Sequence, residues 1–162
     1  MKKLILIFFL FVVIVPGFGC KKKFREEHLA EEFIEAAQNG DVGSLNEFIK
    51  SGVDVDIIYE GHTALMAAAE SGYLYAVICL LSNNAKVNLD VDGITALHFA
   101  VISGNEEIVK LLLKSGGIVT EEVFDLAVSE SLTGIVIILI EYSKRNAACL
   151  GNKAGIFLTF KQ

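Results

Sequence analysis

Residues 93–117 read GITALHFAVISGNEEIVKLLLKSGG, and residues 61–85 read GHTALMAAAESGYLYAVICLLSNNA. The two stretches have the same organisation, with an apolar segment, a glycine break and a second, leucine-containing segment, and they recur with a step of 32. In the later stretch Ile108, Leu111 and Leu112 recur at i, i+3 and i+4, which is the spacing of one helix face. The pattern predicts two short helices joined by a turn in each stretch.

The same step of 32 extends upstream and links six columns of similar residues. They are Ala36, Ala68 and Ala100; Gly40, Gly72 and Gly104; Phe48, Leu80 and Leu112; Ile49, Leu81 and Leu113; Gly52, Asn84 and Gly116; Val55, Val87 and Val119. A period of about 20 to 50 residues is typical of a solenoid, in which each unit has too little apolar surface to fold alone. The repeat therefore predicts an array of stacked helix pairs that share one core.

Signals for the helix ends agree with this interpretation. Asn105 is placed to cap a helix whose first turn holds Glu106 and Glu107, at the positive end of the helix dipole. Residues 115–117 (Ser-Gly-Gly) are predicted to end that helix, because glycine suits the left-handed position after a helix. Asp92-Gly93 predicts a tight turn between units.

The motif Gly93–Val101, followed by Gly104 and Ile108–Leu113, resembles an ankyrin repeat, and Gly61–Ala69 begins a second copy. Phe33–Asp56 resembles a first, capping copy, and a divergent fourth follows Thr120 at an offset of 27. The resemblance implies an all-α ankyrin-repeat solenoid of helix–turn–helix units joined by short hairpin turns. About four repeats are expected, at 29–60, 61–92, 93–119 and 120–145, with residues 146–162 as a C-terminal cap or tail. The step of 32 is one residue shorter than the family's usual 33.

The resemblance also implies roles for individual residues. Five are expected to be structural, with the His98 ring bridging turn backbone between units: Thr63, Thr95, His98, Gly72 and Gly104. Ankyrin arrays bind partners through their turn tips and the exposed side of their first helices. Carried over by column, the expected partner-binding residues are Ile58, Tyr59, Glu60, His62, Glu70, Val91, Asp92, Ile94 and Ile102. The alternative for the apolar members is burial between units.

The N-terminus predicts an export signal. Lys2 and Lys3 precede the apolar run Leu4–Val15, which is shorter than the about 20 helical residues that span a bilayer. Small residues at Gly17 and Gly19 favour cleavage before Cys20. Residues 1–19 are thus expected to be a signal peptide.

A cysteine at this junction resembles a bacterial lipoprotein signal, which implies lipidation of Cys20 and a basic tether over residues 20–28. The expected location is extracytoplasmic and membrane-anchored, periplasmic or on the cell surface. Simple secretion stays open. So does an uncleaved anchor with the body on the cytoplasmic face, because the charge of Lys21–Arg25 exceeds that of Lys2 and Lys3.

Charge is unevenly distributed along the 162 residues. The whole chain has a net charge of −6, but eight of its fourteen Lys and Arg residues and all twenty acids follow Arg25, a net −12. Binding to nucleic acid is disfavoured, since it depends on cations that neutralise phosphates. A protein partner with a basic patch is favoured by long-range attraction.

No sequence pattern points to catalysis. The three histidines and the cysteines lack metal-ligand spacing, and there is no Gly-rich phosphate loop or nucleophile elbow. We therefore expect no enzyme activity, metal, cofactor or small-molecule substrate. Cys79 is expected to be buried and too far from Cys149 for a disulfide, and the apolar run Ile135–Ile140 is expected to form a buried helix.

These observations predict a non-catalytic protein-interaction scaffold displayed at a bacterial membrane. The alternative is an inhibitor or immunity-type protein that occludes an envelope or secreted enzyme.

Overall fold

The structure, a computed structural model, describes residues 18–150, with side chains from Glu26 to Asn146. Residues 1–17, which make up most of the expected signal peptide, and the side chain of Cys20 lie outside this range. So do residues 151–162 of the expected C-terminal cap or tail and the side chain of Cys149.

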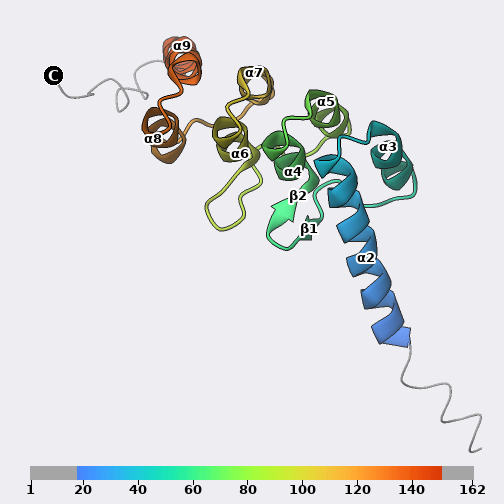
Figure 1. The fold of residues 1–162 in the computed structure, drawn as a ribbon. Coiled ribbons are helices and arrows are strands. Elements are labelled where there is room, and N and C mark those ends of the chain that lie inside the picture. Colours follow the sequence, from blue (N-terminus) through green and yellow to red (C-terminus); the bar gives the residue numbers. More distant parts are fainter. Residues whose placement is uncertain (1–17, 151–162) are drawn as a thin grey trace, which may run out of the picture.

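Eight helices and one small hairpin make up the described part of the chain. In order they are α2 (Phe18–Gln38), α3 (Val42–Lys50), β1 (Ile58–Tyr59), β2 (His62–Thr63), α4 (Ala64–Glu70), α5 (Leu74–Ser82), α6 (Ala96–Ile102), α7 (Glu106–Lys114), α8 (Glu121–Ser129) and α9 (Thr133–Leu150). Helices α2, α4, α6 and α8 form an inner row, and α3, α5, α7 and α9 an outer row (Figure 1). Each helix packs on its partner and on the corresponding helix of the next pair. The expected all-α solenoid is confirmed.

The connections between helix pairs differ along the array. Thirteen residues separate α5 from α6, whereas six separate α7 from α8, and the shorter connection forms no hairpin. This accounts for the change in repeat spacing from 32 to 27 at the fourth copy. Helix α8 is nine residues long and α6 seven, so part of the missing length is recovered in the helix itself.

The first helix is longer than the other inner helices. Helix α2 has 21 residues, and its backbone is helical through the whole of the expected tether, 20–28. Glu, Lys and Ala make up eleven of the 21 residues of α2, and all three are good helix formers. The N-terminal end of α2 projects beyond the rest of the array (Figure 1).

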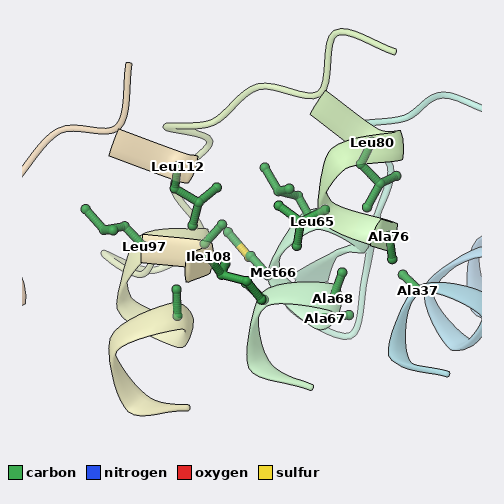
Figure 2. Packing of buried hydrophobic residues seen from close by; sticks show 14 of the residues in the cluster. Ala37, Leu65, Met66, Ala67, Ala68, Ala76, Leu80, Leu97, Ile108 and Leu112 are labelled. Atoms are coloured by element: carbon green, nitrogen blue, oxygen red, sulfur yellow. The ribbon is translucent and has the colours of Figure 1, made fainter. Parts of the chain in front are cut away.

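The core is a continuous strip between the two rows. Six consecutive residues of α4, from Ala64 to Ala69, are buried because α4 lies between α2, α6 and α5. Figure 2 shows Met66, Leu97 and Ile108 gathered between the second and third helix pairs. Burying side chains of this size contributes about 1.5–3 kcal/mol each relative to leaving them exposed. Each pair thus depends on its neighbours for most of its core.

The alanine column explains how closely the inner helices approach. Ala36, Ala68 and Ala100, with Ala127 in the fourth pair, are all buried. A methyl side chain lets neighbouring helices pack without a bulky residue between them. The repeat therefore places the smallest side chain at the same contact in each layer.

Polar side chains cap two of the outer helices. Asn105 Oδ1 accepts from the backbone N–H groups of Glu107 and Ile108, both at 3.1 Å, which confirms the predicted cap of α7. Asp41 caps α3 in the same way through Ser44 N–H, at 3.1 Å. The equivalent residue of α5 is Tyr73, which makes no side-chain cap.

The last helix is buried on one face only. In the run 135–140, Ile135 and Leu139 are buried, whereas Ile137 and Ile140 are exposed. The run is helical, as expected, but the prediction of full burial was wrong for these two residues. Cys79 is buried, and its thiol donates to Asn46 Oδ1 at 3.5 Å. Over the described residues, no helix combines the length and the apolar character needed to cross a bilayer.

Candidate protein-binding surface

Two tight turns project from the inner row of helices. Glu60 and Gly61 connect β1 to β2, and Asp92 and Gly93 connect Val91 to Ile94, which form a two-hydrogen-bond bridge of 3.0 and 2.9 Å. All four turn residues have positive φ, between 48° and 83°. Positive φ at both central residues defines the type I′ turn, whose twist matches that of a hairpin. The predicted turn at Asp92-Gly93 is confirmed.

The residues expected to bind a partner divide into two groups. The side chains of Ile58, Ile94 and Ile102 are 50%, 41% and 56% exposed. Their charged neighbours are also exposed, namely Glu60, Glu70 and Asp92. By contrast, Tyr59, His62 and Val91 are half-buried, with Tyr59 and Val91 packed against the core. The exposed apolar residues of this set are therefore the three isoleucines, which have exposed acids as neighbours, whereas the other three side chains are half-buried.

Tyr59 reports the electrostatic environment of the first hairpin. Strand β1 packs on α2. Burial raises the pKa of the Tyr59 phenol, and the negative charges of Glu31, Glu60 and Glu27 raise it further. The carboxylates of Glu27 and Glu31 on α2 and of Glu60 in the turn of the hairpin therefore all act on the Tyr59 hydroxyl.

His62 connects the first hairpin to the next repeat. Its ring lies 5.2 Å from that of Phe99 on α6, with an interplanar angle of 40°. Its Nδ1 lies 3.1 Å from the backbone oxygen of Glu60. The contact helps to hold the hairpin beside α6, so part of the His62 side chain serves to fix the surface.

The residues expected to be structural lie at helix starts and at left-handed turns. Thr63 Oγ1 accepts from Met66 N–H at 3.2 Å and caps α4. Thr95 and His98 form a capping box on α6, in which His98 Nδ1 accepts from Thr95 N–H at 3.1 Å. This bond lies within one repeat, because residue 98 is in the first turn of α6 and its ring reaches its own N-cap. The expected bridge from the ring to turn backbone of another unit stays a prediction.

Burial lowers the pKa of His98, while the nearby carboxylates of Glu122 and Asp90 oppose that change. The imidazole is therefore held in its neutral form, which can accept at Nδ1. Gly72 and Gly104 have φ of 77° and 68°, and both follow an inner helix at the turn to its partner. Their expected structural role agrees with a backbone conformation that side chains disfavour.

Polar contacts between repeats add a feature that the sequence interpretation missed. Asp56 Oδ1 accepts from Lys86 N–H at 2.8 Å, and Asn88 donates to Gly116 O and accepts from Ile118 N–H, both at 2.9 Å. Asp56 and Asn88 are separated by one repeat step, so they form one column of the repeat. The spacing and residue types could have indicated this column, because a short polar side chain recurs there. Each side chain ties the base of one unit to the next.

The inner and outer rows of helices differ in the sign of their charged side chains. The inner helices, counting α2 from Glu26, and the tips of the two turns carry acids and no Lys or Arg in the described part of the chain. These acids are Glu26, Glu27, Glu31, Glu32, Glu35, Glu60, Glu70, Asp92, Glu121, Glu122 and Asp125. The outer helices carry both signs, with Lys50, Lys110, Lys114, Lys144 and Arg145 among their cations. The surface that holds the three isoleucines is thus uniformly acidic.

A second exposed apolar patch lies on the outer row. Tyr73, at the start of α5, and Tyr75 and Ile78, on α5, are exposed. In α7 the residues at the positions of Tyr75 and Ile78 are Glu107 and Lys110. The sequence interpretation did not single out these residues, although the absence of charge in α5 signals them.

Within the described residues, no group of three or more His, Cys, Asp or Glu side chains could hold a metal ion. The geometry consists of helix caps, tight turns and an acidic face with apolar side chains. Such an arrangement can hold a complementary surface in place. It defines the class of helix-pair solenoids that present turns and inner helices for binding.

Comparison with known proteins agrees with this class. Residues 33–122, more than half of the chain, match the family described as "Ankyrin repeats (3 copies)". The chain belongs to the ankyrin-repeat family. It is therefore a protein–protein interaction scaffold, of a kind that is generally non-catalytic.

Several curated proteins share these repeats. The chain is 33% identical over 97 residues to "Ankyrin repeat and KH domain-containing protein mask-1" of Caenorhabditis elegans, covering 59% of this chain and 4% of that protein. It is 34% identical over 96 residues to "Inactive serine/threonine-protein kinase TEX14" of Mus musculus, covering 58% and 7%. It is 33% identical over 87 residues to "Potassium channel AKT2/3" of Arabidopsis thaliana, covering 52% of this chain and 11% of that protein. The chain thus spans a small part of each of these relatives.

Proposed function

We propose that this protein holds another protein that carries a basic segment, and that it does so at a bacterial membrane. The observation that carries the proposal is the uniform negative charge of the turn tips and of the inner helices from Glu26 onward, which also present Ile58, Ile94 and Ile102. Exposed apolar side chains rimmed by charge are what a protein-binding surface needs, because the apolar contacts give affinity and the rim gives orientation. A surface with only acids attracts Lys and Arg and repels acidic competitors.

The solenoid supports this function by rigidity. The Asp56 and Asn88 bridges fix one unit against the next, and His62 fixes the first hairpin against Phe99. A preformed surface loses less conformational entropy on association than a flexible one. The membrane location rests on the N-terminal signal and on the lipoprotein-like Cys20, which would bear the anchor.

Site-specific crosslinking tests the surface. A photo-crosslinking residue is placed at Ile94 or Ile102 of the full chain in the bacterium, with Ile137 as the control, since its exposure of 52% matches theirs but it lies on the outer row. We expect one partner to crosslink at residues 94 and 102 and not at 137. Equal crosslinking at all three positions, or only at 137, contradicts the proposed surface.

Charge reversal tests the chemistry of the partner. Glu60→Lys should abolish the crosslink from residue 94, whereas Glu107→Lys on α7 should preserve it. A partner that is an envelope or secreted hydrolase would identify the protein as its inhibitor, and one without enzymatic activity would identify a scaffold. Acyl labelling that is lost in Cys20→Ala would support the lipid anchor, and labelling that persists would exclude it.

A further inference from the structure

The end of the array formed by α8 and α9 exposes positions that are buried one repeat earlier. At the offset of 27 that relates the third and fourth copies, Val101 corresponds to Val128 and Leu113 to Ile140. Val101 is 0% exposed and Val128 52%, while Leu113 is 2% exposed and Ile140 36%. Val136 is half-buried, whereas its counterpart in the third copy, Val109, is buried. We call Val128, Val136 and Ile140 the end face.

The end face is apolar at the positions where the third repeat is covered by the fourth. A solenoid that ends in water needs a polar outer face on its last unit. These three residues are instead the types that a further layer would bury. An apolar surface of this kind marks a contact that the described residues do not supply.

The chain itself contains a suitable segment directly after α9. Residues 151–162 read GNKAGIFLTFKQ, with four large apolar residues among Ile156–Phe160 and with Lys153 and Lys161 as the only charged side chains. Val128 lies on the same helix as the exposed acids Glu121 and Asp125. The segment therefore matches the end face in apolar character, and its two lysines are opposite in charge to the exposed acids of α8.

The segment is long enough to reach the end face. Ile140 lies ten helical residues before Leu150, a distance of about 15 Å along α9. The five residues Gly151–Gly155 can span about 17 Å when extended. Because the segment is covalently attached, its effective concentration at the end face is about millimolar, so it outcompetes a second copy of the chain at micromolar concentration.

We propose that Ile156–Phe160 pack over the end face and close the apolar end of the array. The inference does not depend on the proposed function. It is tested in the full chain by hydrogen exchange of the α8 and α9 amides. Val128→Ser should speed this exchange about tenfold, because serine cannot make the apolar contact and differs little from valine in helix propensity. Ile137→Ser should leave it unchanged, since Ile137 has the same exposure as Val128 but corresponds to the exposed Lys110.

The double variant Phe157→Ser/Phe160→Ser removes the proposed cover. It should speed exchange as Val128→Ser does, and adding Val128→Ser to it should have no further effect. Equal effects of Val128→Ser and Ile137→Ser, or a Val128→Ser effect that persists without the two phenylalanines, would overturn the proposal. A dimer in sedimentation that Val128→Ser dissociates would also overturn it and assign the end face to a second copy.

Discussion

Two glycines with the same backbone conformation should respond differently to substitution by alanine. Gly40 and Gly104 have φ of 69° and 68°. A Cβ at Gly104 would lie 3.8 Å from Leu132, an ordinary contact, whereas one at Gly40 would lie 2.5 Å from Cδ1 of Tyr73. In Gly104→Ala, the left-handed conformation of an alanine is expected to cost about 1–2 kcal/mol of folding free energy. Alanine also lowers the entropy of the unfolded chain, which offsets about 0.5–1 kcal/mol of this cost. The net loss is about 1 kcal/mol.

Gly40→Ala must also displace the Tyr73 ring. Losing the packing of this half-exposed ring adds about 1–2 kcal/mol, so the total destabilisation is about 2–3 kcal/mol. The assay is urea unfolding of the full chain followed by far-UV circular dichroism, with the slope m unchanged. In a Tyr73→Ala background the cost of Gly40→Ala should fall to that of Gly104→Ala, since the overlapping ring is gone. Equal costs for both glycines in the native background, or an excess that survives Tyr73→Ala, would refute the reasoning.

Three further outcomes follow from the contacts between and within repeats. Asn88→Ala should destabilise the protein by about 0.5–1.5 kcal/mol in urea unfolding because it removes two solvent-exposed hydrogen bonds between repeats, and Asn88→Asp should cost less because it keeps the acceptor for Ile118 N–H. The lowered pKa of His98 means that the unfolded chain binds more protons, so stability should be complete above about pH 6.5 and fall as the pH drops below it. His98→Met introduces the residue found one repeat earlier, at position 66. In this variant the urea midpoint of unfolding should depend less on pH between pH 7.5 and 5.5 than it does in the native protein. Ser131→Gly should raise the free energy of unfolding by about 0.5–1 kcal/mol in the same urea assay, since Ser131 has φ of 57° in the glycine column.

The sequence was sufficient to predict the stacked helix pairs because the constraint repeats. Ala68 and Ala100 must be small in every layer, and Gly72 and Gly104 must have the same backbone conformation at every turn. Such requirements recur at a fixed step and are visible without coordinates. The cap at Asn105 was equally accessible, because it depends on residues within one turn.

Features that depend on the path of a loop could not be obtained in this way. The half-burial of Tyr59 and Val91 depends on how the hairpins lie against the inner helices, which no spacing encodes. The bridge from Asn88 to residues 116 and 118 depends on where the next loop passes. Ile140 was expected to be buried because burial was inferred from residue type, whereas its exposure reflects the lack of a following helix pair among the described residues.

The separation of charge also determines how an anchored array can be oriented. Anionic lipid head groups would repel the turn tips and the inner helices from Glu26 onward, because these carry acids such as Glu60 and Asp92 and, over the described residues, no Lys or Arg. They would attract the basic start of α2, Lys21–Arg25, and the outer helices, which carry Lys110 and Lys114. The repulsion acts within about 8–10 Å of the surface at physiological salt, which is close to the width of one helix. With the anchor proposed at Cys20, the binding surface is therefore held away from the membrane. Under the proposed function, the acids that would attract a basic partner would also keep its site from being covered by lipid.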